Sequence, residues 1–190
     1  MKRLLSCLAL AAASLVLSLP AAATVLTFDD ITSDGTVAAN YGGLDWSTGN
    51  WFAFGGDEAP YTPHSGTVRV TSGFDADDAA TAIGLGAGRT FQGAWFAGLE
   101  GATVTFQLYD HGTLVATSAT LDPSATPTWL ASGYDGLVDE VIVSSPFQAL
   151  YVMDDFTFSD AVPEPASIAQ LLGGVLLLGA AARRRANTPR

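Results

Sequence analysis

Alternation of apolar and polar residues with a period of two runs through the middle of this chain and constrains its fold more than any other feature. Across residues 102–109 every second residue is apolar, namely Val104, Phe106 and Leu108. Successive residues of a strand point to opposite faces, so this pattern predicts half-buried β-strands. No stretch of the body has a sustained helical period. Further strands are expected at 68–70, 114–119, 137–143 and 150–158.

Turn-forming residues separate these runs. Asp110-His111-Gly112 predicts a hairpin turn between the strands on either side, and residues 84–88 are expected to form a turn between strands. Roughly nine short strands at this spacing favour an all-β fold. We expect a single β-sandwich domain over residues 24–161, with a jelly-roll-like topology.

The segment before this body has the layout of an export signal. Two basic residues precede an apolar run over residues 4–19, and the alanines at 21–23 suit signal peptidase. We interpret residues 1–23 as a signal peptide that is cleaved after Ala23. The alternative is a retained membrane helix, for which the run is short. The only cysteine, Cys7, lies inside this signal, so the exported chain has no thiol for a disulfide or a metal site.

The end of the chain carries three features in order: Pro163-Glu164-Pro165, an apolar run over residues 168–182, and the basic cluster Arg183, Arg184 and Arg185. The apolar run has 15 residues, whereas crossing a bilayer core comfortably takes about 20. We expect it to insert transiently into the inner membrane as a helix, with the arginines on the cytoplasmic side. A plain single-pass anchor is the alternative. Residues 186–190 form a short tail.

This order of motifs, over residues 162–185, resembles the PEP-CTERM sorting signal of exported bacterial proteins. The resemblance implies recognition by an exosortase, a membrane-embedded cysteine transpeptidase of bacteria that have an outer membrane and secrete exopolysaccharide. Signal peptidase and exosortase are therefore the expected processing partners. The expected destination is the cell envelope, the outer surface or the extracellular matrix.

Charge is distributed unevenly along the chain. Between Asp29 and Asp160, eighteen acidic residues face two basic ones, Arg69 and Arg89, which leaves a net charge of −16. Such a field opposes binding to nucleic acid or anionic lipid and favours either divalent cations or simple solubility. The acidic cluster at 75–78 lacks the glycine and the terminal glutamate of an EF-hand, so we interpret it as a solvated turn.

Acidic residues at the two ends of the body indicate a cation site. If the first and last strands pair antiparallel with Phe28 opposite Phe156, then Asp30 lies opposite Asp154. Directly opposed like charges destabilise a sheet, and Ca²⁺ binds about six to eight oxygen ligands. The alternative is that these acids lie in water at sheet edges. The expected ligands of a structural Ca²⁺ are Asp29, Asp30, Asp154 and Asp155, the first and last of them only if the backbone bends there.

The aromatic residues of the region 41–61 admit two interpretations, since flat rings pack on sugar faces but large aromatics more often pack in a core. They are Tyr41, Trp46, Trp51, Phe52, Phe54 and Tyr61. The chain has two histidines, His64 and His111, and no GxSxG motif. A serine hydrolase or a zinc enzyme is therefore poorly supported.

Several short motifs of the body resemble those of galactose-binding-like domains and carbohydrate-binding modules. They include Leu-Thr-Phe-Asp-Asp at 26–30 and Met-Asp-Asp-Phe-Thr-Phe at 153–158. This resemblance implies a non-catalytic β-sandwich whose terminal strands share a structural calcium. The sequence as a whole favours an exported, non-enzymatic envelope or matrix protein associated with exopolysaccharide. The alternative is a small extracellular glycan-active enzyme that uses a carboxylate pair.

Overall fold

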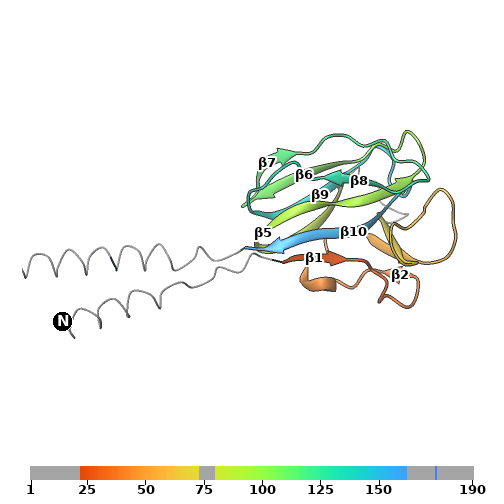
Figure 1. The fold of residues 1–190 in the computed structure, drawn as a ribbon, viewed down its shortest axis with the longest axis horizontal. Helices are drawn as coiled ribbons and strands as arrows, with labels where there is room; N and C mark the ends of the chain where they lie inside the picture. Colours follow the sequence, from red (N-terminus) through yellow and green to blue (C-terminus); the bar gives the residue numbers. More distant parts are fainter. Residues whose placement is uncertain (1–21, 73–79, 162–173, 175–190) are drawn as a thin grey trace, which may run out of the picture. The chain divides into compact units, whose positions relative to one another are not determined.

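Antiparallel β-strands make up the body of the chain, as the alternating pattern predicts (Figure 1). The structure is a computed structural model that describes residues 22–72, 80–161 and Gly174. All the strands belong to one unit, Ala22–Ala161. Residues 1–21, the acidic cluster at 75–78 and the expected sorting signal other than Gly174 lie outside the described residues. Within the described ranges, no helix has the length and apolar character that crossing a membrane requires.

The described residues of this unit form ten strands and one 3-10 helix. In chain order these are β1 (Ala23–Leu26), β2 (Gly35–Thr36), η2 (Tyr41–Gly43), β3 (Trp51–Phe54), β4 (Arg69–Ser72), β5 (Ala80–Gly98), β6 (Thr105–Asp110), β7 (Thr113–Thr117), β8 (Thr128–Ala131), β9 (Val138–Ser144) and β10 (Tyr151–Asp160). Five of them coincide closely with the runs expected from the sequence. The all-β prediction is confirmed.

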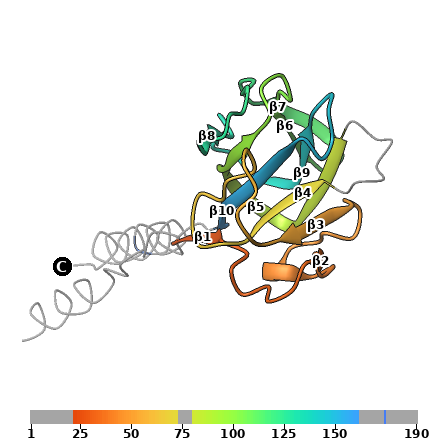
Figure 2. The same ribbon diagram turned by 90° about the vertical axis from the view of Figure 1, so that its right-hand side faces the viewer.

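Two long strands, β5 and β10, lie side by side at the centre of the fold (Figures 1 and 2). On its other edge, β10 pairs first with β4 and then with β1. β5 likewise pairs with β9 through its first half and with β8 through its second half. The sheet therefore has an arm β2-β3-β4 on one side and an arm β9-β6-β7 on the other, and it folds over on itself as a sandwich. A jelly-roll topology stays a prediction.

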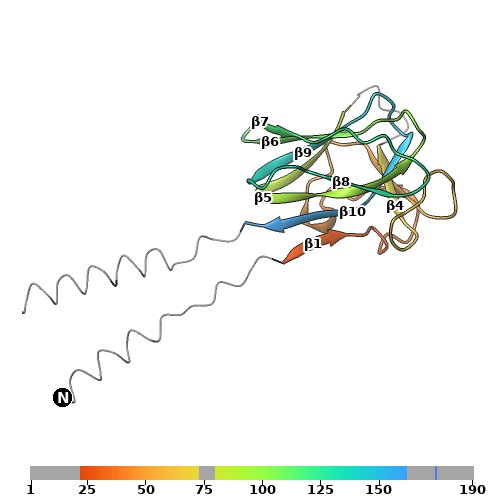
Figure 3. The ribbon, with the colours of Figure 1, turned by 45° about the horizontal axis from the view of Figure 1, so that its top comes forward.

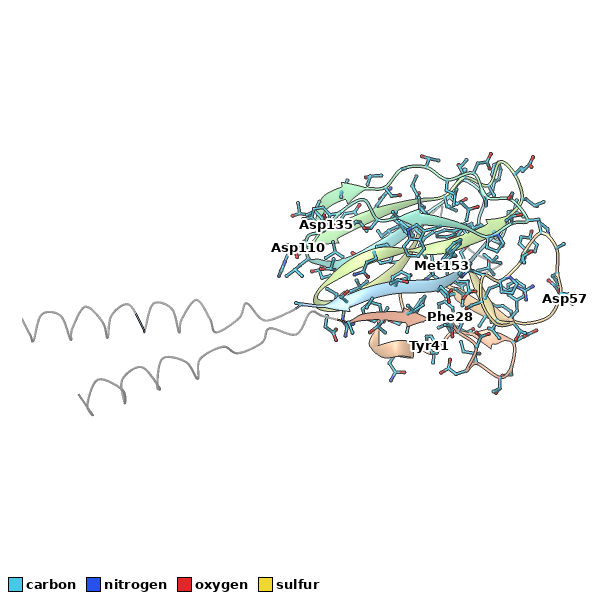
Figure 4. The ribbon with its side chains drawn as sticks, viewed as in Figure 1. Phe28, Tyr41, Asp57, Asp110, Asp135 and Met153 are labelled. Atoms are coloured by element: carbon cyan, nitrogen blue, oxygen red, sulfur yellow. The ribbon has the colours of Figure 1, made fainter. Side chains whose placement is uncertain are left out.

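One hydrophobic core fills the space inside this folded sheet. Phe28 and Met153 are fully buried there (Figure 4). The rings of Phe91 and Phe156 stack with their centroids 4.6 Å apart, and Trp46 meets Trp51 edge to face at 5.7 Å. Each such side chain contributes roughly 2 kcal/mol when it leaves water, so the aromatic residues dominate the stability of the core.

Two expected turns have different outcomes. The hairpin turn at Asp110-His111-Gly112 is confirmed, since β6 and β7 pair across it and His111 and Gly112 have φ values of 50° and 74°. The expected turn at residues 84–88 is wrong because β5 continues through it. There, Gly84 lies opposite Glu140 and Arg89 lies opposite Val138. The four residues 85–88 of β5 therefore form a bulge opposite the single β9 residue at position 139.

The first and last strands pair antiparallel, as predicted, but in a different register. Leu26 lies opposite Phe156, the position that the sequence analysis gave to Phe28. Strand β1 ends at Leu26 because Phe28 has a φ of 60°, and the N–H of Ile31 donates to the carbonyl of Phe28 at 3.0 Å, which closes a turn. The predicted opposition of Asp30 and Asp154 is therefore wrong.

Candidate functional site

One residue from each of five neighbouring strands forms a row on the face of the sheet that points away from the core. Core residues Met153 and Val70 pair across β10 and β4, so the next residues along each strand, Asp154 and Arg69, lie side by side on the opposite face. Strands lie about 4.8 Å apart, so the row spans about 19 Å. We call it the outer row: Phe54, Arg69, Asp154, Trp95 and Trp129, on β3, β4, β10, β5 and β8.

The loop 55–68, between β3 and β4, covers the middle of the outer row. The imidazole of His64 stacks on the indole of Trp95 with the ring centroids 3.5 Å apart and the planes 10° from parallel. Arg69 Nη1 donates to the carbonyl of Gly56 at 2.6 Å, and the Arg69 side chain is fully buried. In Figure 4, Asp57 marks this loop at the end of the domain away from the free ends of β1 and β10.

Two consecutive carboxylates of β10 hold the loop in place. Asp154 Oδ2 accepts hydrogen bonds from the backbone N–H groups of His64 and Ser65, both at 2.8 Å. Asp155 Oδ2 lies 2.6 Å from His64 Nδ1, and its Oδ1 accepts from the Ser65 hydroxyl at 2.7 Å. Adjacent residues of a regular strand point to opposite faces. Both acids reach the loop because Asp155 has a φ of 50° at a bulge in β10.

Burial sets the electrostatics of this site. The pKa of Asp154 is raised to about 7, chiefly by burial and also by the charge of Asp155, while the N–H donors of the loop act in the opposite direction. Burial also lowers the pKa of Arg69, against the influence of Glu58 and other nearby acids. The Arg69 guanidinium lies 4.1 Å from the centroid of the Phe54 ring, and its Nε and Nη2 have no hydrogen-bond partner among the described residues.

The four acids predicted to share a calcium ion make separate contacts. Asp29 Oδ1 accepts from the N–H groups of Thr67 and Val68, at 2.7 and 3.1 Å, so it holds the end of the same loop. Asp30 Oδ1 accepts from the Tyr41 hydroxyl at 2.6 Å. The structure thus brings Asp154 and Asp155 together on the loop and gives Asp30 a different partner. A shared cation at these four positions stays a prediction.

A different group of residues brings together side chains of the types that bind metals. In the described part of the chain, the ligand atoms of Asp110, His111 and Asp139 lie within 4.8 Å of one another at the β6–β7 hairpin. His111 donates its N–H to Asp139 at 2.9 Å, and its Nδ1 lies 2.7 Å from Asp110. These contacts account for the arrangement, because the hairpin turn carries Asp110 and His111, and Asp139 lies on the neighbouring strand β9.

The aromatic residues of the region 41–61 divide between the core and the outer face. Trp46 and Trp51 are 2% and 1% exposed and belong to the core. Phe54 and Tyr61 instead line a cavity of about 250 Å³ on the outer face.

Sequence reasoning missed Trp95 and Trp129, which are half-buried on the outer face and meet at a centroid distance of 5.9 Å. Residues five positions apart in a regular strand point to opposite faces, yet both Phe91 and Phe96 point into the core. Gly93, with a φ of 147° and a shifted register, breaks the alternation between them. Trp95 therefore points outward from a stretch that looks uniformly apolar.

The fold and the site together define an all-β domain with an aromatic outer face under a tethered loop. No protein-family model matches the chain, and no curated protein sequence matches it. The similar solved structures include single-residue variants of CBM29-2, a family 29 carbohydrate-binding module. One is 11% identical, with 76% of this chain and 100% of that chain covered and a TM-score of 0.40. A second is 10% identical, with 74% and 91% covered and a TM-score of 0.41.

Proposed function

We propose that this chain is an exported, non-enzymatic protein of the cell envelope or extracellular matrix that binds polysaccharide on its outer face. The observation that carries the proposal is the cross-strand pair of Trp95 and Trp129, two large aromatic side chains placed outside the core and left half-buried. Aromatic side chains of this kind are usually covered, so their exposure on a sheet face is informative. Flat indole rings pack well on the C–H faces of sugars.

His64 adds to this surface. Its imidazole is held parallel to Trp95 by the contact with Asp155, and about a third of its side chain, 34%, is exposed. The surface offered to a ligand is therefore the exposed side of His64 together with Trp129. Because hydrogen bonds to β10 fix the loop, the domain binds without first paying the entropy of ordering it.

The sorting motif Pro163-Glu164-Pro165, the apolar run and the basic cluster 183–185 support the location. In the proposal, signal peptidase removes the leader and an exosortase processes the C-terminal signal at the inner membrane. A polysaccharide-binding domain released by this route meets exopolysaccharide at the cell surface.

One observation favours the enzymatic alternative. A carboxyl with a pKa near 7, such as that of Asp154, suits general acid catalysis. Asp154 is nevertheless only 2% exposed, and its Oδ2 accepts two hydrogen bonds from the loop. Neither Asp154 nor its neighbour Asp155 is free to reach a glycosidic bond, so binding is the better supported function.

The test is polysaccharide binding by the unit Ala22–Ala161, which contains every described strand and the whole hydrophobic core. We expect Trp129→Ala to weaken retention on an immobilised polysaccharide by about tenfold or more, equivalent to about 1.4 kcal/mol. Leu114→Ala, which removes an exposed apolar side chain from the distant strand β7, is the control. Equal retention of both variants contradicts the proposal. Release of reducing ends that is lost in Asp154→Asn supports the enzyme instead.

A further inference from the structure

The cavity on the outer face adjoins the outer row and shares Phe54 with it. Its floor is formed by Phe54, Thr71 and Val152, which come from β3, β4 and β10. Val152 and Thr71 are each two residues from a member of the outer row, and residues two apart share a face. The cavity therefore opens on the same face of the sheet as the outer row.

Two short backbone segments form the walls. On one side, the loop 55–68 makes a turn in which the N–H of Tyr61 donates to the carbonyl of Glu58 at 2.7 Å, and both side chains line the cavity. On the other side lie Ala149 and Leu150, where the N–H of Ala149 donates to the Ser72 hydroxyl at 3.2 Å. Both walls are held by hydrogen bonds of the domain itself, so the cavity is formed before any ligand arrives.

The chemistry of the lining is mostly apolar, with two polar groups. In the described part of the chain, neither the Glu58 carboxylate nor the Tyr61 hydroxyl has a hydrogen-bond partner, whereas the Thr71 hydroxyl donates to the carbonyl of Tyr151 at 2.8 Å. An ionised carboxylate only accepts hydrogen bonds. The lining thus offers Glu58 as an acceptor for a donor group of the ligand.

The charges around the cavity favour a cation. The acids Asp34, Asp57 and Glu58 are close enough to influence Arg69. Arg69 is covered by the loop on one side and by Phe54 on another. Its guanidinium group therefore offers no hydrogen-bond donor to the cavity. The Tyr61 ring adds an attraction for a cation placed over its face, whereas the Phe54 ring already has the Arg69 guanidinium over one of its faces.

We propose that this cavity binds one sugar unit with a free amine, a hexosamine at the end or on a branch of the polysaccharide. This proposal rests on the proposed polysaccharide binding and names the sugar class at one point of the site. The ammonium group donates to Glu58, and the apolar face of the ring packs on Phe54 and Val152. A volume of about 250 Å³ lies below the roughly 300–1,000 Å³ of pockets for drug-sized ligands, so it admits a single ring.

The experiment compares the methyl glycosides of glucosamine, glucose and glucuronic acid by titration into Ala22–Ala161 at low salt and a pH that keeps the amine charged. We expect the glucosaminide to bind about tenfold more tightly than the glucoside, and the glucuronide to bind most weakly. Glu58→Gln should remove the advantage of the glucosaminide. Glu100→Gln, which neutralises an exposed acid that does not line the cavity, should keep it.

Three results overturn the inference. The first is equal binding of the three glycosides. The second is tightest binding of the glucuronide, which would indicate that the loop opens to expose Arg69. The third is an amine preference that survives in Glu58→Gln. The polysaccharide assay with Trp129→Ala separates this inference from the proposed function. If polysaccharide retention depends on Trp129 but the glycosides show no amine preference, only the hexosamine proposal for the cavity is overturned. If the glucosaminide binds but no polysaccharide is retained, the proposed function is overturned.

Discussion

The imidazole of His64 lies face to face with the indole of Trp95, with the two ring centroids 3.5 Å apart. The imidazole occupies the face of Trp95 that a flat ligand would otherwise cover. Asp155, whose Oδ2 lies 2.6 Å from His64 Nδ1, holds the imidazole in this position. The loop 55–68 therefore forms part of the outer surface of the site and covers one face of Trp95, which stays half-buried.

Replacing His64 tests this arrangement. In His64→Ala, Trp95 loses its cover, so we expect a red shift of the tryptophan emission and stronger quenching by acrylamide. Loss of the contact with Asp155 should lower the free energy of unfolding by about 1–3 kcal/mol, because a hydrogen bond to a charged group is lost. His111→Ala is the control, because the His111 side chain is 89% exposed. Unchanged emission in His64→Ala would show that the stacking is absent in solution.

The pKa of Asp154 predicts how stability depends on pH. Its folded value of about 7 lies above the ordinary value of 3.8, so the folded protein keeps a proton that the unfolded chain releases between these values. The contribution of Asp154 to stability is thus complete below about pH 4 and is lost as the pH rises through about 7, on the order of a few kcal/mol in all.

Asp154→Asn removes this titration, so urea unfolding between pH 4 and pH 8 should show a flatter stability profile than in the original chain. Asp160→Asn, at an acid that is 75% exposed, serves as the control and should keep the original slope. The difference between variants isolates Asp154 from the repulsion among the other acids. Parallel profiles of the Asp154→Asn variant and the original chain would contradict the prediction.

Two glycines of the loop 55–68 form a matched pair. Gly66 has a φ of +50°, and a Cβ added there would overlap the Asp29 carboxylate, which holds Thr67 and Val68. Gly56 has a φ of +85°, but a Cβ there would meet nothing within 4 Å. We expect Gly56→Ala to cost about 1 kcal/mol from the backbone alone. Gly66→Ala should cost about 2 kcal/mol more, because it also disturbs two hydrogen bonds to a charged group. Equal melting temperatures would contradict this account.

The calcium prediction for Asp29, Asp30, Asp154 and Asp155 is tested by thermal unfolding with up to about 10 mM Ca²⁺, because extracellular modules bind with dissociation constants of roughly 0.1–1 mM. A site specific to the folded state should add about 2.7 kcal/mol at a hundred times its dissociation constant. Mg²⁺ controls for screening of the acidic surface. The prediction requires a larger effect of Ca²⁺ than of Mg²⁺ that disappears in Asp154→Asn. Equal effects of the two ions would contradict a shared calcium site at these four acids.

The sorting proposal predicts processing after about Pro165 in a host that has an exosortase. Glu164→Ala, or removal of Arg183 to Arg185, should leave the C-terminal segment attached. Intact-mass measurement of the exported protein gives the answer directly. An original chain that keeps its full C-terminus in such a host would contradict the proposal.

The sequence was sufficient to predict the strands and insufficient for the places where strands are interrupted. The alternation at 102–109 and 150–158 follows the pleat of a strand, so β6 and β10 lie where it indicates. Phe28 and Asp155 have positive φ values although neither is a glycine, and no local pattern indicates that. The conformation of Asp155 depends on its contacts with residues 64 and 65, about 90 positions earlier in the chain. The register of β1 and the loop-holding role of Asp154 and Asp155 therefore could not be predicted.

The pairing of Ala23 with Ser159 has a mechanical consequence. It brings the two ends of the domain together at one end of β10, whereas the loop 55–68 lies at the opposite end (Figure 3). Strand β10 is hydrogen-bonded to β5 on one edge and to β4 and β1 on the other. A force applied between Ala161 and a polymer bound near the loop would act along this central strand. It would load the hydrogen-bond ladders of β10 with β5, β4 and β1 in shear at the same time. A domain tethered at Ala161 is therefore built to bear tension without an edge strand peeling away first.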